Sequence, residues 1–132
     1  MASPSDHPIV VAAAVVVRDD DVLVTRRLEG THLAGFWEFP GGKCEAGESH
    51  VECLAREMRE ELGVGVRVGE RLLSTRHDYG VKVVELHFFA CSFDEEPQPL
   101  LGQEIRWMPR RDLGTLEFPA ADAELIGLLS RA

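Results

Sequence analysis

Hydrophobic positions along the chain follow two different periods. Residues 9–17 are an unbroken apolar run rich in β-branched side chains, which is typical of a strand covered on both faces. Asp19, Asp20 and Asp21 then favour a turn, and residues 22–25 resume the apolar pattern. The start of the chain therefore predicts two strands joined as a hairpin.

Residues 49–62 have a helical period instead. Ser49 and Glu52 match a capping box, and Gly63 matches the residue that ends a helix. Apolar residues recur three or four positions apart along one stripe, so we expect that face to pack on a sheet. The stripe consists of Val51, Leu54, Ala55, Met58 and Leu62.

The remaining patterns are shorter and are separated by turn residues. We expect strands over 64–73, 81–93 and 105–108, and a terminal helix over 120–129. Loops are expected over 28–35, 77–80 and 94–102, and the alternating segment 37–39 is expected to end at a tight turn over 40–42. This order predicts an α/β (α+β) fold with a mixed sheet, and a length of 132 residues predicts a single domain over 1–132.

The charge balance limits the class of partner. The formal net charge is −9, which disfavours binding to a nucleic acid polymer because such binding depends on clustered Lys and Arg. A small phosphorylated substrate remains compatible with an acidic protein if a divalent cation lies between its phosphates and the carboxylates. We therefore expect a small-molecule partner and no polymer.

Targeting and redox signals are weak. The apolar run over 9–17 is too short to cross a membrane as a helix, and residues 1–8 lack the pattern of a secretory signal. We therefore expect a cytoplasmic protein with no membrane partner. Cys44, Cys53 and Cys91 are odd in number and have no C-x-x-C spacing, so we expect free thiols.

Three glutamates carry the candidate chemistry. Glu57, Glu60 and Glu61 fall within an arc of about 100° on one flank of the predicted helix, and Arg56 lies about one turn before Glu60. A solvated acidic face is one interpretation. The oxygen-rich loop 41–43 just upstream favours another, a site for Mg²⁺, with Mn²⁺ as a possible substitute.

These residues belong to a longer motif, because the chain matches G-x5-E-x7-R-E-U-x-E-E-x-G-U, the Nudix box, without a departure. The matching residues are Gly42, Glu48, Arg56, Glu57, Met58, Glu60, Glu61, Gly63 and Val64. A motif of this length is far more specific than a short glycine motif. The chain therefore resembles the Nudix hydrolases, and the solvated-face interpretation becomes the minor one.

The resemblance implies an α/β/α sandwich around a mixed sheet, in which a loop, a helix and a second loop hold the metal. It implies that Arg56 orients the carboxylates, that Glu48 supports the loop, and that Gly42 and Gly63 allow the turns beside the helix. The implied metal ligands are Gly41 through its carbonyl, Glu57, Glu60 and Glu61.

Outside the box the resemblance extends to the MutT-like branch, through residues 25–27, His32, 37–43 and 118–122. It implies substrate binding by Arg27, His32, Glu38, Phe39, Lys43 and Asp122. The branch has Asn at the last position, where this chain has Asp122. Because Asp lacks an amide donor unless it is protonated, the preferred base stays open.

A further acid follows the loop 100–103, where MutT-like enzymes place an acidic residue that joins the metal site or activates water. The resemblance therefore implies that Glu104 is a metal ligand or catalytic acid; the alternative is an exposed glutamate at the end of a strand. The implied catalytic residues are Arg56, Glu57, Glu60 and Glu104.

The resemblance implies a magnesium-dependent enzyme that hydrolyses a nucleoside triphosphate to a monophosphate and pyrophosphate. An oxidised purine such as 8-oxo-dGTP is the first hypothesis, and CTP or dCTP is the alternative within the same class. A non-catalytic Nudix-fold module that binds a nucleotide or a lesion is the alternative from a different class, although such modules usually have eroded boxes. The state of assembly is expected to be a monomer or a homodimer.

Overall fold

A computed structural model describes residues 8–131, and its centre is a mixed β-sheet. Strand order is β3-β2-β1-β6-β5, with β4 paired to β1 and β7 paired to β2. β1 and β6 run parallel, whereas the other pairs are antiparallel. The strands are β1 (Ile9–Arg18), β2 (Asp21–Arg26), β3 (Trp37–Glu38), β4 (Gly41–Lys43), β5 (Arg67–Asp78), β6 (Val83–Ser92) and β7 (Ile105–Pro109).

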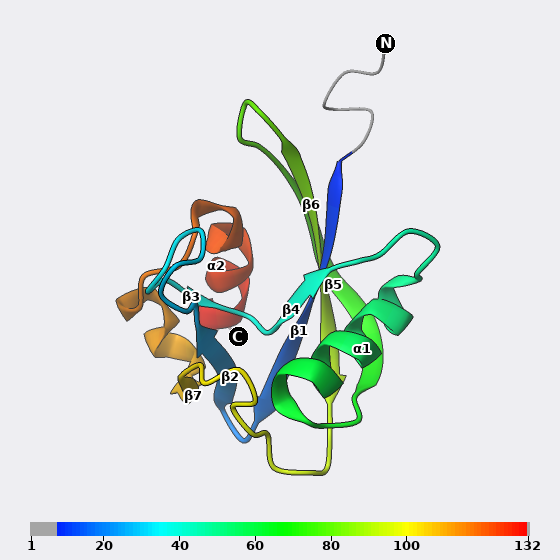
Figure 1. The fold of residues 1–132 in the computed structure, drawn as a ribbon. Coiled ribbons are helices and arrows are strands. Elements are labelled where there is room, and N and C mark those ends of the chain that lie inside the picture. The colour runs from blue at the N-terminus through cyan, green and yellow to red at the C-terminus, as the bar shows by residue number, and fades with distance from the viewer. Residues whose placement is uncertain (1–7, 132) are drawn as a thin grey trace.

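Helices cover both faces of this sheet, as Figure 1 shows for α1 (His50–Leu62) and α2 (Ala123–Arg131). Strand β1 explains the arrangement, because its alternate residues enter two separate cores. Ala12, Ala14 and Val16 pack in the core that contains the buried face of α1, whereas Ala13 and Val15 pack in the core that contains α2. The predicted strand covered on both faces is therefore confirmed, as is the α/β/α sandwich.

Helix α1 begins and ends where local signals predicted. The Ser49 hydroxyl accepts a hydrogen bond from the Glu52 amide at 3.1 Å, and the Glu52 carboxylate accepts one from the Ser49 amide at 2.9 Å. Gly63 ends the helix with φ +69°, a left-handed conformation that glycine adopts without steric cost. These caps hold the acidic flank of α1 in a fixed position relative to β4.

The structure corrects the boundaries of several predicted elements. Residues 41–43 form strand β4, not a turn, because Gly41 and Gly42 come close enough to β1 for the two strands to pair. Strand β5 continues to Asp78, so the predicted turn over 77–80 begins later; Asp78 still pairs with Val83 of β6.

The C-terminal region also departs from the prediction. A 3-10 helix over Arg110–Thr115 was not predicted, and a 3-10 turn over Ala120–Asp122 precedes α2, which begins at Ala123. Pro119 directly precedes that turn.

Two further predictions concern membranes and targeting. Within residues 8–131 no helix combines the length and the apolar character that a membrane crossing requires. The predicted absence of a secretory signal rests on residues 1–8, almost all of which lie outside the described part of the chain.

Candidate active site

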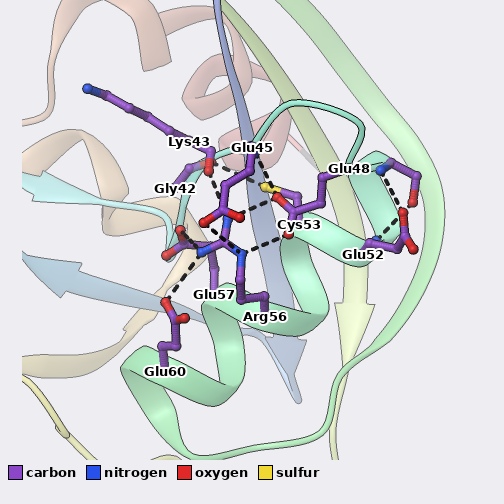
Figure 2. A network of polar contacts seen from close by, with 10 residues as sticks. Gly42, Lys43, Glu45, Glu48, Glu52, Cys53, Arg56, Glu57 and Glu60 are labelled. Carbon is purple, nitrogen blue, oxygen red and sulfur yellow. Dashed lines mark hydrogen bonds and ion pairs between the residues drawn. The ribbon is translucent and has the colours of Figure 1, made fainter.

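Arg56 organises the loop between β4 and α1 (Figure 2). Its guanidinium donates to both carboxylate oxygens of Glu48, at 2.7 and 2.9 Å, and to the Lys43 carbonyl at 3.0 Å. The same group donates to Glu57 at 2.9 Å and to Glu60 at 3.3 Å. Arg56 therefore ties the loop to the acidic flank of the helix.

This network sets the protonation states of its members. The hydrogen bond from Arg56 lowers the pKa of the Glu48 carboxyl to about 2, so Glu48 is ionised throughout the physiological range. The hydrogen bond to Glu48 in turn raises the pKa of Arg56 above its ordinary value. Both groups are therefore charged at neutral pH, and their ion pair holds the loop against α1.

Gly42 allows the closest approach between the loop and α1. A Cβ atom at this position would lie 2.5 Å from the Glu57 carboxylate, closer than two such groups can come. Only glycine therefore lets the Glu57 side chain, which is 14% exposed, lie directly against strand β4. This contact gives a physical reason for a glycine at the first position of the motif.

Glu61 lies beside Glu57 and faces a third acid, Glu38 of β3. Burial, with the negative charges of Glu57 and Glu38, raises the pKa of Glu61 to about 8, against a hydrogen bond from the Gly41 amide that lowers it. Burial likewise raises the pKa of Glu38, and the neighbouring Arg27 opposes that rise. Three carboxyl groups thus share one partly dry region with too little positive charge to balance them.

Glu60 points elsewhere. Its side chain is 59% exposed and bonds Arg56, so of the three predicted ligands the structure brings Glu57 and Glu61 together and leaves Glu60 at the rim. Among the described residues, no set of three or more His, Cys, Asp or Glu side chains is already arranged around a common metal position. A metal shared by all three glutamates therefore requires Glu60 to rotate away from Arg56.

A pocket of about 360 Å³ is lined by residues of this acidic region and by Pro119, Ala121 and Asp122 at the 3-10 turn before α2. All the predicted substrate-binding residues line it: Arg27, His32, Glu38, Phe39, Lys43 and Asp122. Gly41, Gly42, Glu57 and Glu61 line its acidic end. Arg27 pairs with Glu38 at 2.8 Å and also donates to the His32 carbonyl, so the β2–β3 loop is held at the rim.

The same pocket is also lined by the aromatic residues Phe39 and Phe88 and by one buried acid, Asp122. Phe39 stacks on Phe118 with ring centroids 5.4 Å apart and meets Phe88 edge-on at 5.9 Å. Asp122 is only 5% exposed, and burial, with a smaller effect of Glu38, raises its pKa to about 7. A flat apolar surface next to one polar group is an arrangement suited to an aromatic base with a hydrogen-bonding edge.

Comparison with known proteins agrees with this geometry. The profile of the NUDIX domain matches residues 11–128. The chain belongs to the Nudix family. It is 35% identical over 124 residues to a protein of Haemophilus influenzae named 8-oxo-dGTP diphosphatase, covering 92% of this chain and 91% of that protein. It is also 35% identical over 118 residues to the Escherichia coli CTP pyrophosphohydrolase, covering 89% of this chain and 86% of that protein.

Solved structures show the same fold. The solution structure of the E. coli ORF135 protein matches with a TM-score of 0.85 and 31% identity, over 99% of this chain and 96% of that one. A structure from a study of MutT from Aliivibrio salmonicida and Vibrio cholerae matches with a TM-score of 0.76 and 28% identity. The match covers 94% of this chain and 97% of that one. These matches confirm the prediction of a MutT-like Nudix hydrolase, an enzyme that cleaves phosphoric anhydride bonds. Members of this family generally need a divalent metal.

Glu104 lies outside the acidic cluster of this Nudix hydrolase. Its carboxylate pairs with Arg106 at 3.0 Å and with Arg26 at 3.6 Å, and it is 44% exposed, so the structure places it in an ion-pair network on β7. The buried residue of this loop is its neighbour Gln103, which donates to the Glu61 carbonyl at 3.1 Å. The loop therefore contacts the end of the Nudix helix through the Gln103 amide. The metal or catalytic role of Glu104 stays a prediction.

Sequence reasoning missed three residues around the Nudix site. Gln103 precedes Glu104, and only the glutamate has a role predicted from the sequence. A buried glutamine amide needs hydrogen-bond partners, and the free carbonyl groups at the end of a helix can supply them. Tyr79 and Lys82 come from the β5–β6 hairpin, which reaches the base end of the pocket. Nothing local marks these two residues, because only the pairing of β5 with β6 brings the hairpin there.

Proposed function

We propose that the chain is a magnesium-dependent nucleoside triphosphate pyrophosphohydrolase that releases a nucleoside monophosphate and pyrophosphate. The observation that carries the proposal is one pocket lined by two unlike sets of residues. Glu57, Glu61 and Glu38 supply carboxylates, and Phe39 and Phe88 supply aromatic surface with Asp122 as a further polar group. A nucleotide combines the same two requirements, because its phosphates need a charged site and its base needs an aromatic surface.

The acidic end fits a hard divalent cation. Its donors are carboxylates and the Gly41 carbonyl, an all-oxygen set that Mg²⁺ prefers and Mn²⁺ accepts. Burial, with the charges of Glu57 and Glu38, raises the pKa of Glu61, and a cation bound beside these carboxylates would favour the ionised form. Glu57 and Glu61 would hold it, with Glu60 joining after leaving Arg56. When bound, the metal would neutralise phosphate charge and make a water molecule more acidic.

The protein's own residues would complete the reaction. Arg27 and Lys43 line the pocket near the acidic end and would bind phosphate oxygens by charge-assisted hydrogen bonds. His32 lies on the same rim. We propose that Glu57 accepts the proton of the attacking water, because Gly42 and Arg56 hold its carboxylate in one position. Glu104, whose carboxylate pairs with Arg26 and Arg106, is the second candidate for this role.

An oxidised purine triphosphate such as 8-oxo-dGTP is the first candidate substrate, and the Haemophilus influenzae relative named 8-oxo-dGTP diphosphatase supports it. CTP or dCTP is the second, supported by the equally similar E. coli CTP pyrophosphohydrolase. Because the pKa of Asp122 is raised to about 7, its carboxyl can act as a donor and an acceptor near neutral pH. The Asp122 carboxyl could therefore hydrogen-bond the edge of an oxidised purine base or of a cytosine base.

A nucleotide panel tests the proposal. We expect Mg²⁺-dependent release of monophosphate and pyrophosphate, measured by chromatography of the products, with the highest kcat/KM for 8-oxo-dGTP or for CTP or dCTP. Addition of EDTA is expected to abolish the reaction and excess Mg²⁺ to restore it. Binding of nucleotide without product, at any Mg²⁺ concentration, would contradict the proposal and support a binding module.

Asp122→Asn tests the base end separately. The variant has a fixed amide in place of a titrating carboxyl, so we expect the ratio of kcat/KM between 8-oxo-dGTP and CTP to change by about tenfold or more. Metal dependence is expected to stay as in the parent protein. An unchanged ratio would show that Asp122 does not contact the base.

Asp122 also predicts a change in stability with pH. Its folded-state pKa of about 7 lies above the ordinary value, so the folded protein loses stability as the pH rises from about 4 to about 7. Asp122→Asn removes this loss. We expect the variant to be more stable than the parent by roughly 2–4 kcal/mol at pH 8 and equally stable near pH 4, measured by urea unfolding.

A further inference from the structure

Two cysteines meet beneath the loop of the Nudix box, although they are nine positions apart. Cys53 is fully buried in α1, and its thiol donates to the Gly42 carbonyl at 3.6 Å. Figure 2 shows its sulfur directed at the loop, near Glu48. Cys44, two residues beyond Gly42, packs against the core cluster that contains Cys53, and each thiol influences the pKa of the other.

One member of this cysteine pair is partly accessible to solvent, unlike the cysteines of a fully buried pair. Cys44 is half-buried and lines a surface groove together with Ile9, Lys43 and His50. Its amide donates to the Val10 carbonyl at 2.8 Å, so β1 holds this residue in place. Cys44 is therefore the cysteine that a small oxidant would meet first, and the buried Cys53 would supply the second thiol.

We propose that Cys44 and Cys53 form a reversible intramolecular disulfide that links β4 to α1 and lowers the activity of the enzyme. All three cysteines are free in the reduced protein. The proposed oxidant is hydrogen peroxide. The bond would form at the residue that follows β4, two positions beyond Gly42, the glycine at which an added Cβ would meet the Glu57 carboxylate.

The reaction balances in two steps. The Cys44 sulfur attacks one peroxide oxygen, the O–O bond breaks, and a sulfenic acid and one water are formed. The Cys53 sulfur then attacks the sulfenic sulfur, the S–O bond breaks, and a second water leaves. Two thiols lose two hydrogens in total, and the peroxide is reduced to two waters.

The environment makes this reaction slow. Burial raises the pKa of both thiols, and the Glu48 carboxylate contributes to the rise, so both are protonated at neutral pH. Oxidation is therefore expected to need sustained exposure to peroxide.

The disulfide would act on the site through Gly42. Its formation removes the thiol hydrogen that Cys53 donates to the Gly42 carbonyl and draws the loop toward α1. Because Gly42 is in van der Waals contact with the Glu57 carboxylate, a shift of the loop moves that carboxylate. Small displacements of a catalytic group lower rates strongly, so we expect kcat to fall by about tenfold or more.

The test is peroxide treatment of the whole chain over hours, followed by alkylation and mass measurement under denaturing conditions. We expect a species lighter by about 2 Da before alkylation, with only Cys91 of the three thiols alkylated. Cys91→Ser is expected to form the same cross-link. Cys44→Ser is expected to form no cross-link and to keep its activity after peroxide; its partly exposed position makes the substitution tolerable even if Cys53→Ser misfolds.

Dithiothreitol is expected to restore both the mass and the activity of the oxidised parent protein. A parent protein that keeps three alkylatable thiols, or a cross-linked protein with unchanged kcat, would overturn the proposal. The activity part rests on the proposed function, but the mass does not. A reduced protein that hydrolyses no nucleotide would therefore refute the proposed function while the cross-link is still tested by mass.

Discussion

Glu57→Gln is expected to abolish nucleotide hydrolysis while the protein stays folded. The substitution keeps the size of the side chain but removes the charge that would hold the cation and accept the proton from water. Stabilisation of the reacting phosphate by a metal is worth several kcal/mol, so kcat is expected to fall by about 10³-fold. Initial rates at saturating Mg²⁺ and nucleotide measure the effect.

Glu52→Gln is the matched control on the same helix. Glu52 lies in the first turn of α1 and takes part in the capping box, a role that glutamine also performs. Its rate is expected to stay within about twofold of the parent protein, because the residue lies away from the acidic cluster. Equal losses in the two variants would mean that helix stability, not metal binding, explains the result. Full activity of Glu57→Gln would refute the role assigned to Glu57.

Gly41→Ala is expected to destabilise the fold itself. An added Cβ would lie 2.1 Å from the Ala12 carbonyl oxygen and 2.7 Å from the Ala13 Cα. These are backbone atoms of the central strand, which cannot move aside without disturbing its pairing with β6. We expect the free energy of unfolding to fall by about 3 kcal/mol, measured by urea denaturation.

Gly114→Ala provides the comparison for this substitution. An added Cβ there meets no atom within 4 Å, and the backbone is not in the left-handed region. Its free energy of unfolding is expected to stay within about 1 kcal/mol of the parent value. If Gly41→Ala were equally well tolerated, the close approach of β4 to β1 described above would be incorrect.

The amino-acid sequence by itself determined the parts of the protein that depend on near neighbours. The period of apolar residues and the caps at Ser49 and Gly63 act within a few positions, so α1 was predictable almost to the residue. The same locality placed the acids of the box on one flank of that helix. The apolar run over 9–17 likewise predicted a strand buried on both faces, since no other element needs so continuous an apolar surface.

Only the tertiary structure decided which distant residues meet. Glu38 lies beside Glu61 because β3 pairs with β2, and Cys44 meets Cys53 because β4 pairs with β1 next to α1. The orientation of Glu104 toward two arginines, with Gln103 turned inward in its place, also depends on how β7 joins the sheet. Such contacts are set by strand pairing across long stretches of chain, and the pattern of neighbouring residues does not encode them.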